Sequence, residues 1–183
     1  MSEERKHLEQ RNNLQLFEAT LLPHLSAAYN FARWLLRDQS GAEDVVQESY
    51  LRALKYFSGY HGGDSRAWLL TIVRNTSYNW LRQNRARELI NPIDDATEEL
   101  AATNDTNPET VLLQRIDHDL LRQALSELPI EFREVLILRE MEGLSYKEIA
   151  ALAELPIGTV MSRLARARGR LQKKLAGRLN QEI

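Results

Sequence analysis

The stretch GLSYKEIAALAELPIGTVMSRLARARGRL, residues 143–171, contains two short segments in which apolar residues recur at helical spacing, with a tight break between them. Ser145 and Glu148 form a capping-box pattern that starts the first segment, and Pro156 ends the connecting turn. A helix, a turn of about four residues and a second helix match the spacing of a helix-turn-helix motif. The stretch therefore predicts a helix-turn-helix from Ser145 to Arg168.

The second of these segments separates into an apolar side and a polar side when its residues are placed at intervals of about 100°. The apolar side, which we expect to be buried, holds Val160, Leu164, Ala167 and Leu171. The opposite side carries small or adaptable residues with basic residues at its margins: Met161, Ser162, Ala165, Arg166 and Gly169, flanked by Arg163, Arg168, Arg170, Lys173 and Lys174. Small side chains allow close approach to a DNA major groove, where we expect Arg166 to reach guanine edges and Met161 and Ala165 to contact thymine methyl groups. Thr159, near the helix N-terminus, is expected to bind a phosphate.

Charge is distributed in blocks along the chain, although the formal net charge is only -2. Residues 61–90 hold five basic and two acidic side chains, residues 91–127 hold two basic and nine acidic, and residues 128–183 hold ten basic and seven acidic. A solvated surface helix remains the alternative for the second segment. However, seven basic residues and no acidic one lie between Met161 and Gln181, whereas a merely solvated face normally mixes both signs. The pattern favours nucleic-acid binding.

The rest of the chain is also predicted to be helical, because its apolar residues recur at helical spacing and it lacks hairpin turn signals. Pro23 is expected to separate one helix from the next, and Ser40 with Glu43 forms a second capping-box pattern. The predicted helices cover residues 24–37, 40–57, 65–86, 111–126, 130–140, 145–153 and 158–176. The sequence therefore predicts an all-α fold.

Two small helical domains are expected, at residues 8–90 and 111–180. The segment between them, residues 91–110, is acidic, flanked by proline and poor in large apolar residues, which is typical of a flexible linker. The chain has no cysteine, and its four histidines lack the spacing of metal ligands, so no metal or cofactor is expected. The charged N-terminal residues do not resemble a signal peptide, and no run of about 18 apolar residues occurs, so a cytoplasmic protein is expected.

The long predicted helix at residues 65–86 has an apolar and a mixed face. The apolar face, expected to be buried, holds Leu69, Ile72, Val73, Thr76 and Trp80. The other face interleaves basic groups with an aromatic ring: Ala67, Thr71, Arg74, Tyr78, Arg82 and Arg85, with Asn75 and Asn79 at its edge. Such a face suits phosphate contact and base stacking, and a solvated face with Tyr78 partly covering the core is the alternative.

The predicted helix at residues 40–57 carries a leucine on its polar face. We expect Val45, Val46, Tyr50, Ala53 and Phe57 to face inward, and Asp44, Gln47, Glu48, Arg52 and Lys55 to face outward. Leu51 lies in the middle of the outward set. A single exposed leucine is ordinary, but one surrounded by carboxylates, an amide and an arginine is also typical of a protein-binding anchor.

These pieces together resemble the extracytoplasmic-function (ECF, group 4) sigma factors of bacterial RNA polymerase, and the resemblance covers nearly the whole chain. AEDVVQESYLRAL resembles the family's helix that binds core polymerase. RAWLLTIVRNTSYNWLRQNRAR resembles the stretch that opens and reads the -10 promoter element. LPIEFREVLILREMEGLSYKEIA, followed by LPIGTVMSRLARARGRL, resembles the domain that reads the -35 element. The resemblance implies that the two domains are sigma region 2 and sigma region 4.

The resemblance also implies roles for the matching positions. Core polymerase, through the clamp helices of its largest subunit, would be bound by Asp44, Gln47, Glu48, Leu51 and Arg52. The -10 element would be held by the loop residues Gly59, Tyr60, His61, Gly62, Gly63, Asp64 and Ser65 and contacted by Arg74, Asn75, Tyr78 and Arg82. The -35 element would be read by Thr159, Met161, Ser162, Arg163, Ala165, Arg166 and Arg168.

The family implies three partners: core RNA polymerase, promoter DNA and an anti-sigma factor that covers the same surfaces. Retention of the protein at the membrane by that anti-sigma factor is the alternative to a free cytoplasmic protein. It implies no catalytic residue. A stand-alone helix-turn-helix regulator with a helical sensing domain is the alternative interpretation. An enzyme finds no support, because the paired carboxylates of the linker lie beside no histidine or phosphate loop.

Two positions depart from the family pattern. Glu154 stands where the family commonly has glycine, so the turn is expected either to bend differently or to hold Glu154 in a strained conformation. Met161 stands where a basic residue is frequent, so a shifted base preference is expected.

Overall fold

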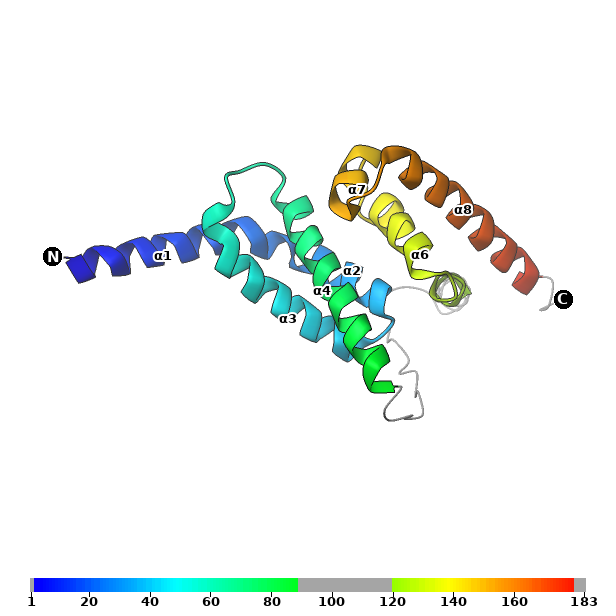
Figure 1. The fold of residues 1–183 in the computed structure, drawn as a ribbon, viewed down its shortest axis with the longest axis horizontal. Coiled ribbons are helices and arrows are strands. Elements are labelled where there is room, and N and C mark those ends of the chain that lie inside the picture. Colours follow the sequence, from blue (N-terminus) through cyan, green and yellow to red (C-terminus); the bar gives the residue numbers. More distant parts are fainter. Residues whose placement is uncertain (1, 89–119, 180–183) are drawn as a thin grey trace, which may run out of the picture. The chain divides into compact units, whose positions relative to one another are not determined.

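The structure is a computed structural model that describes residues 2–88 and 120–179, and it describes side chains over residues 11–84 and 120–177. All regular secondary structure in these ranges is helical, which confirms the predicted all-α fold (Figure 1). The chain divides into two compact units, Met1–Asp94 and Asp95–Ile183. The linker predicted at residues 91–110 lies outside the described residues.

The first unit is built around three mutually packed helices (Figure 1). Its elements are α1 (Ser2–Leu21), the short 3-10 helix η1 (Leu22–His24), α2 (Leu25–Leu36), α3 (Gln39–Tyr56), the 3-10 helix η2 (Phe57–Gly59) and α4 (Ser65–Glu88). Pro23 falls inside η1, so the chain breaks between α1 and α2 where its missing N–H and fixed φ predict a break. The core is formed by fully buried side chains such as Phe31, Leu35, Val45 and Leu69.

The start of α3 differs from the prediction. Asp38, not Ser40, is the N-cap, because its side chain accepts a hydrogen bond from the backbone N–H of Gly41 at 3.1 Å. Asp and Ser are both good N-cap residues, and the one two positions earlier starts the helix here. The Glu43 carboxylate accepts a hydrogen bond from the Gln39 side chain at 3.3 Å instead of closing a capping box on Ser40.

α3 and α4 approach each other closely at Gly41. A Cβ atom at this position would lie only 2.4 Å from Cζ2 of Trp80, so the contact requires glycine. α4 packs against both α2 and α3. Its buried face is consequently shifted from the predicted one. Leu69, Val73 and Thr76 are buried as predicted, and Leu70 and Ser77 are buried with them. Ile72 and Trp80, which were predicted to be buried, are only partly buried.

The second unit contains the predicted helix-turn-helix. Residues 120–126 are helical, and the elements after them are α6 (Ile130–Leu136), the π-helical turn η3 (Ile137–Met141), α7 (Tyr146–Ala153) and α8 (Ile157–Leu179). Both α6 and α7 pack against α8. The helix predicted at residues 130–140 therefore ends in a π turn, in which the Glu142 N–H donates to the Ile137 carbonyl at 3.0 Å.

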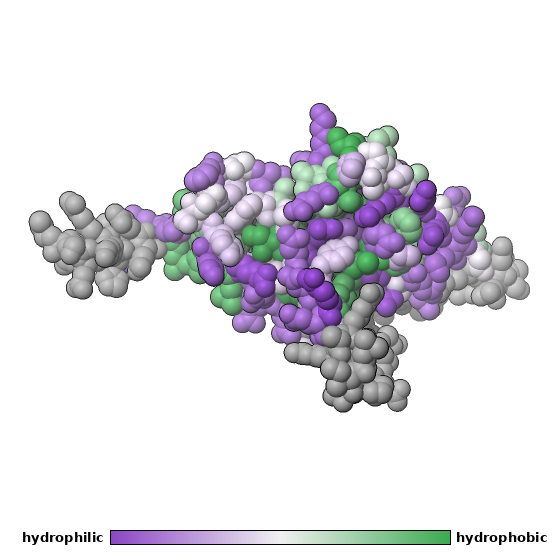
Figure 2. Space-filling model, in the orientation of Figure 1, coloured by the Kyte–Doolittle hydropathy of each residue, from purple (hydrophilic) through white to green (hydrophobic). Residues whose placement is uncertain are grey.

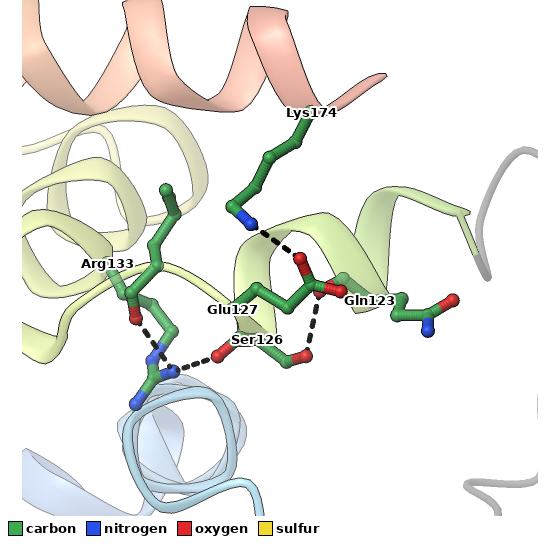
Figure 3. A network of polar contacts seen from close by, with 6 residues as sticks. Gln123, Ser126, Glu127, Arg133 and Lys174 are labelled. Carbon is green, nitrogen blue, oxygen red and sulfur yellow. Dashed lines mark hydrogen bonds and ion pairs between the residues drawn. The ribbon is translucent and has the colours of Figure 1, made fainter. Parts of the chain in front are cut away.

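A polar network ties the segment 123–128 to α6 and α8 (Figure 3). The Arg133 guanidinium donates a hydrogen bond to the Ser126 carbonyl oxygen at 2.9 Å. On the other side of the same segment, Lys174 of α8 forms an ion pair with Glu127 at 2.5 Å. Lys174 thus stabilises the packing of α8 and is not simply part of a free basic surface.

The helix-turn-helix begins and ends as its sequence predicts. Ser145 caps α7 by accepting from the Glu148 N–H at 3.2 Å, and the Glu148 carboxylate accepts from the Ser145 N–H at 2.6 Å, which completes a capping box. α7 ends in a Schellman motif, with Leu155 N–H donating to the Ala150 carbonyl. Its left-handed position is Glu154, at φ 55° and ψ 45°. The turn therefore keeps its usual shape and places the strain on Glu154.

Replacing Glu154 with glycine is expected to stabilise the second unit by about 1 kcal/mol, because glycine adopts the left-handed conformation without a Cβ clash. Urea unfolding followed by circular dichroism would report the gain. Trp34, Trp68 and Trp80 all lie in the first unit, so tryptophan fluorescence follows that unit separately. Gly143→Ala, at a φ of 67° in the same unit, is the matched control and should destabilise it. If the Glu154→Gly variant were less stable than wild type, the inference that Glu154 is conformationally strained at this turn would be wrong.

Candidate functional site

The outer face of α3 carries four of the five residues predicted to bind a protein in exposed positions. Asp44, Gln47, Glu48 and Leu51 are exposed, and the Leu51 side chain is 59% accessible. The fifth, Arg52, is half-buried and is held along the helix by an ion pair with Glu48 at 2.7 Å. The carboxylate of Glu48 thus sets the position of the guanidinium beside Leu51. The outward orientation predicted for this face is confirmed.

An open apolar groove lies beside this face. It is lined by Leu22, Leu25, Tyr29, Glu43, Val46, Gln47 and Tyr50. Leu22 and Leu25 are both exposed, as is Leu54 on α3. On the side of the molecule that Figure 2 shows, apolar patches interrupt the hydrophilic surface of the first unit. Helical spacing does not predict the groove, and its only signal in the sequence is the pair of leucines, Leu22 and Leu25, on either side of Pro23.

Tyr50 is one of the residues that line this groove, and it joins α1 to α3. Its hydroxyl donates a hydrogen bond to the Leu21 carbonyl at 2.8 Å, and its ring packs edge-on against Phe17. Burial raises the pKa of the Tyr50 hydroxyl to about 12, so it stays a neutral donor at physiological pH. The prediction that Tyr50 faces inward is thus only partly met, because the side chain is half-buried.

The loop between α3 and α4 contains the residues predicted to hold a base. Gly62 and Gly63 have φ angles of 94° and 100°, which ordinary L residues rarely adopt. The Tyr60 hydroxyl donates to the Gly63 carbonyl at 2.7 Å and so closes the loop on itself. Asp64 caps α4 by accepting from the Ala67 N–H at 3.0 Å. The remaining members of the predicted set are His61 and Gly59, which are exposed, and Ser65, whose hydroxyl lies 2.9 Å from a ring nitrogen of His24.

Aromatic rings stack at the base of this loop. Phe57 and Tyr60 are nearly parallel, with ring centroids 5.8 Å apart, and Trp68 lies 5.1 Å from Tyr60. Phe57 is buried, whereas Tyr60 and Trp68 are partly exposed. Trp68 was not among the predicted site residues, although an aromatic residue three positions after the helix start was visible in the sequence. Together the rings form an aromatic cluster next to the glycine-rich loop, with the Trp68 ring tilted by 40° from that of Tyr60.

The outer face of α4 holds the second part of the predicted -10 set. The Arg74 guanidinium lies over the Tyr78 ring at 4.7 Å from its centroid, a cation–π contact. The Arg82 side chain hydrogen-bonds to the Asn79 amide oxygen one turn earlier. Asn75 is exposed. The arginines on this face are therefore oriented by their neighbours along the helix.

The recognition helix α8 divides as predicted into a buried and an exposed side. Val160, Leu164 and Ala167 are buried, and Leu171 is half-buried. The predicted -35 residues Met161, Ser162, Ala165, Arg166 and Arg168 are exposed, while Thr159 and Arg163 are partly exposed. The helix-turn-helix therefore presents the surface that its sequence pattern indicates.

Part of the basic charge of α8 is engaged within the unit. Arg168 donates two hydrogen bonds to the Glu140 carboxylate, at 2.6 and 3.2 Å, and these hydrogen bonds raise the pKa of its guanidinium. The Arg170 guanidinium lies 4.6 Å from the centroid of the Phe132 ring. Arg166, in contrast, makes no ion pair with any residue of the described second unit. Arg163 likewise makes no ion pair in the described second unit, but it is only partly exposed, so Arg166 is the more accessible of the two.

Two further properties concern the described residues as a whole. Within residues 2–88 and 120–179, no group of three or more His, Cys, Asp or Glu residues is arranged to hold a metal ion. No helix in the described parts of the chain is long and apolar enough to cross a membrane.

Two family models match the chain, and each matched range falls within one of the two units. The model described as Sigma-70 region 2 matches residues 21–87, and the one described as Sigma-70, region 4 matches residues 118–171. The first range contains α2, α3 and all but the last residue of α4, and the second contains the predicted helix-turn-helix. The chain therefore combines a sigma region 2 domain with a sigma region 4 domain.

Similar proteins place the chain more narrowly. It is 35% identical over 154 residues to the ECF RNA polymerase sigma factor SigE of Mycolicibacterium smegmatis, covering 84% of this chain and 59% of that protein. It is 32% identical over 175 residues to the RNA polymerase sigma-H factor of Pseudomonas aeruginosa, covering 91% and 89%. Its structure is similar to that of the sigma factor RpoE of Bartonella quintana, solved with the anti-sigma factor NepR, with a TM-score of 0.72, 30% identity and coverage of 87% and 96%. The chain belongs to the ECF group of the sigma-70 family.

Proposed function

We propose that this chain binds core RNA polymerase, directs it to promoters with matching -10 and -35 elements, and supports promoter opening. The observation that carries the proposal is the presence, in one chain, of an apolar anchor on the acidic α3 face and a basic recognition helix on α8. The first suits a protein partner and the second suits DNA. Polymerisation itself belongs to the core enzyme, so no catalytic step is assigned to this chain.

The proposed core-binding surface combines the α3 face with the adjoining groove. Leu51 lies on the same face of α3 as Asp44 and the Glu48–Arg52 ion pair, while Leu22 and Leu25 line the groove with Gln47. Interfaces are stabilised chiefly by a few apolar anchors surrounded by polar groups that exclude water. A helical partner with basic side chains around an apolar ridge fits this arrangement. The clamp helices of the largest polymerase subunit are the partner that the family implies.

The proposed -10 contacts use the loop after η2 and the outer face of α4. The partly exposed rings of Tyr60 and Trp68 lie beside Gly62 and Gly63, where the glycines leave open space around the backbone. A base that has left the duplex can stack on such rings, and base stacking on aromatic residues contributes about 1–3 kcal/mol per base. Asn75, Tyr78 and Arg82 on α4 would contact the same strand or the flanking duplex.

The proposed -35 contacts use the exposed side of α8, with Arg166 as the main hydrogen-bond donor to bases. The predicted acidic linker and the net charge of -2 give the free chain little long-range attraction to DNA. Core polymerase would therefore supply most of the affinity. An anti-sigma factor that covers these surfaces would act as the regulator, by analogy with the complex of the Bartonella relative.

Transcription in vitro tests the proposal. Core polymerase with and without this chain is incubated with a genomic fragment library, and transcript start sites are mapped. The expected result is a set of start sites that appear only with both proteins and share two sequence elements. The chain alone should bind the same promoters weakly at physiological salt. Tight, specific binding without core, and no new start sites, would favour a stand-alone helix-turn-helix regulator instead.

A further inference from the structure

The first three turns of α8 carry an apolar ridge on their exposed side. Ile157 and Met161 are 42% and 52% accessible. Only one other large apolar side chain, Met141, is comparably exposed among the described residues of the second unit. Ala165, one turn further on, is also exposed. Figure 2 shows apolar surface at the corner where α7 meets α8.

The ridge and Arg166 lie on different flanks of the recognition helix. Residues four positions apart differ by about 40° around a helix, so Ile157, Met161 and Ala165 form one continuous line. Met161 and Arg166 are about 140° apart at the same spacing. In a DNA major groove, this helix would therefore present the apolar ridge to one side of the groove and the Arg166 guanidinium to the other.

The polar groups beside the ridge are engaged within the protein. Arg168 lies about 20° from Met161 around the helix, and its guanidinium is paired with Glu140 at 2.6 Å. The Ser162 hydroxyl donates to the Thr159 carbonyl at 3.0 Å. The ridge flank consequently offers a base apolar contact rather than a hydrogen bond.

We propose that this ridge recognises a thymine in the -35 element through its C5-methyl group, with Met161 as the residue that determines the choice. The inference rests on the proposed function and deepens it. Thymine is the only base that presents a methyl group in the major groove. A cytosine or adenine amino group placed against the ridge would lose its water without gaining an acceptor, which is unfavourable. The ridge therefore favours thymine over these bases at one position.

The experiment uses holoenzyme reconstituted from core polymerase and the full chain, on a promoter taken from the start-site map. Each thymine of the -35 element is replaced in turn by deoxyuridine, which removes only the methyl group, and occupancy is measured by fluorescence anisotropy. At one position the wild-type holoenzyme should bind about fourfold more weakly, which corresponds to about 0.8 kcal/mol for one buried methyl-sized group. Holoenzyme with Met161→Ala should show no difference between thymine and deoxyuridine there.

Two controls keep the outcomes distinct. Lys173→Ala, on the Arg166 flank, should retain the full sensitivity to deoxyuridine, and Met161→Arg should shift the preferred base at that position from thymine to guanine. Met161 is exposed, so its variants should fold, and circular dichroism verifies this. If the holoenzyme still opens the promoter but binds thymine and deoxyuridine equally at every position, thymine recognition by the ridge is refuted and the proposed function stands. A holoenzyme with no promoter preference at all would overturn the proposed function as well.

Discussion

Replacing Leu51 with glutamate is expected to abolish binding to core RNA polymerase while leaving the fold intact. The side chain is 59% accessible and lies between the Glu48–Arg52 ion pair and the groove beside Gln47. A carboxylate at this position would be desolvated in the interface and would add a third negative charge near Asp44 and Glu48. Loss of a buried central anchor typically costs 2 kcal/mol or more, and the added charge increases that loss. Co-purification with core polymerase and the anisotropy of the labelled chain titrated with core would measure it.

The matched control is Leu16→Glu on α1. Leu16 is 60% accessible, so the two substitutions introduce the same charge at leucines of equal exposure. Leu16 does not line the groove. Its variant should bind core polymerase like wild type, and tryptophan fluorescence should show unchanged unfolding for both proteins. Normal co-purification of the Leu51→Glu variant with core would refute the assignment of α3 as the polymerase-binding helix.

The two capping patterns show how far local sequence determines a helix start. Ser145 and Glu148 form the predicted box because no competing cap residue precedes them within the turn. At Ser40 the same pattern fails, because Asp38 caps the helix first and Gly41 is already packed beneath the Trp80 ring. Trp80 lies 39 residues further along the chain. The helix start was thus mispredicted because a competing local cap lies two residues earlier, whereas the requirement for glycine at position 41 comes from a tertiary contact that periodicity does not reveal.

The candidate functional surfaces also contain features that helical spacing predicts and features that depend on tertiary packing. The outward placement of Leu51 and Met161 follows from helical spacing, and both are exposed in the structure. The groove could not be predicted in this way, because its lining residues Leu22 and Tyr50 come from segments that meet only when α2 packs on α3. The ion pair of Arg168 could not be predicted either, because its partner Glu140 lies 28 residues away in sequence. Sequence thus predicts which residues a helix exposes, and the packing of helices determines which of their charges are engaged inside the protein.

Substituting Arg166 with alanine is expected to weaken promoter binding by holoenzyme by about 1–3 kcal/mol, and to do so at one base position only. Arg168 is bound to Glu140 and Arg170 lies over Phe132, whereas Arg166 is exposed opposite the buried stripe of α8. An arginine that makes two hydrogen bonds to guanine distinguishes that base from the other three, so its loss should relax specificity there. Binding of holoenzyme to promoters randomised at each -35 position would locate the change.

Lys173→Ala is the matched control for this prediction, because Lys173 lies about 20° from Arg166 around α8 and two turns further along it. A lysine in this place suits phosphate contact, so its loss should weaken all promoters about equally and lower the salt dependence by about one charge. Arg166→Ala should instead change the base profile. If both variants gave the same uniform loss, Arg166 would be a phosphate contact, and direct base readout on this flank of the helix would be ruled out. A profile altered only by Arg166→Ala would assign the guanidinium to one base pair, on the flank opposite the apolar ridge.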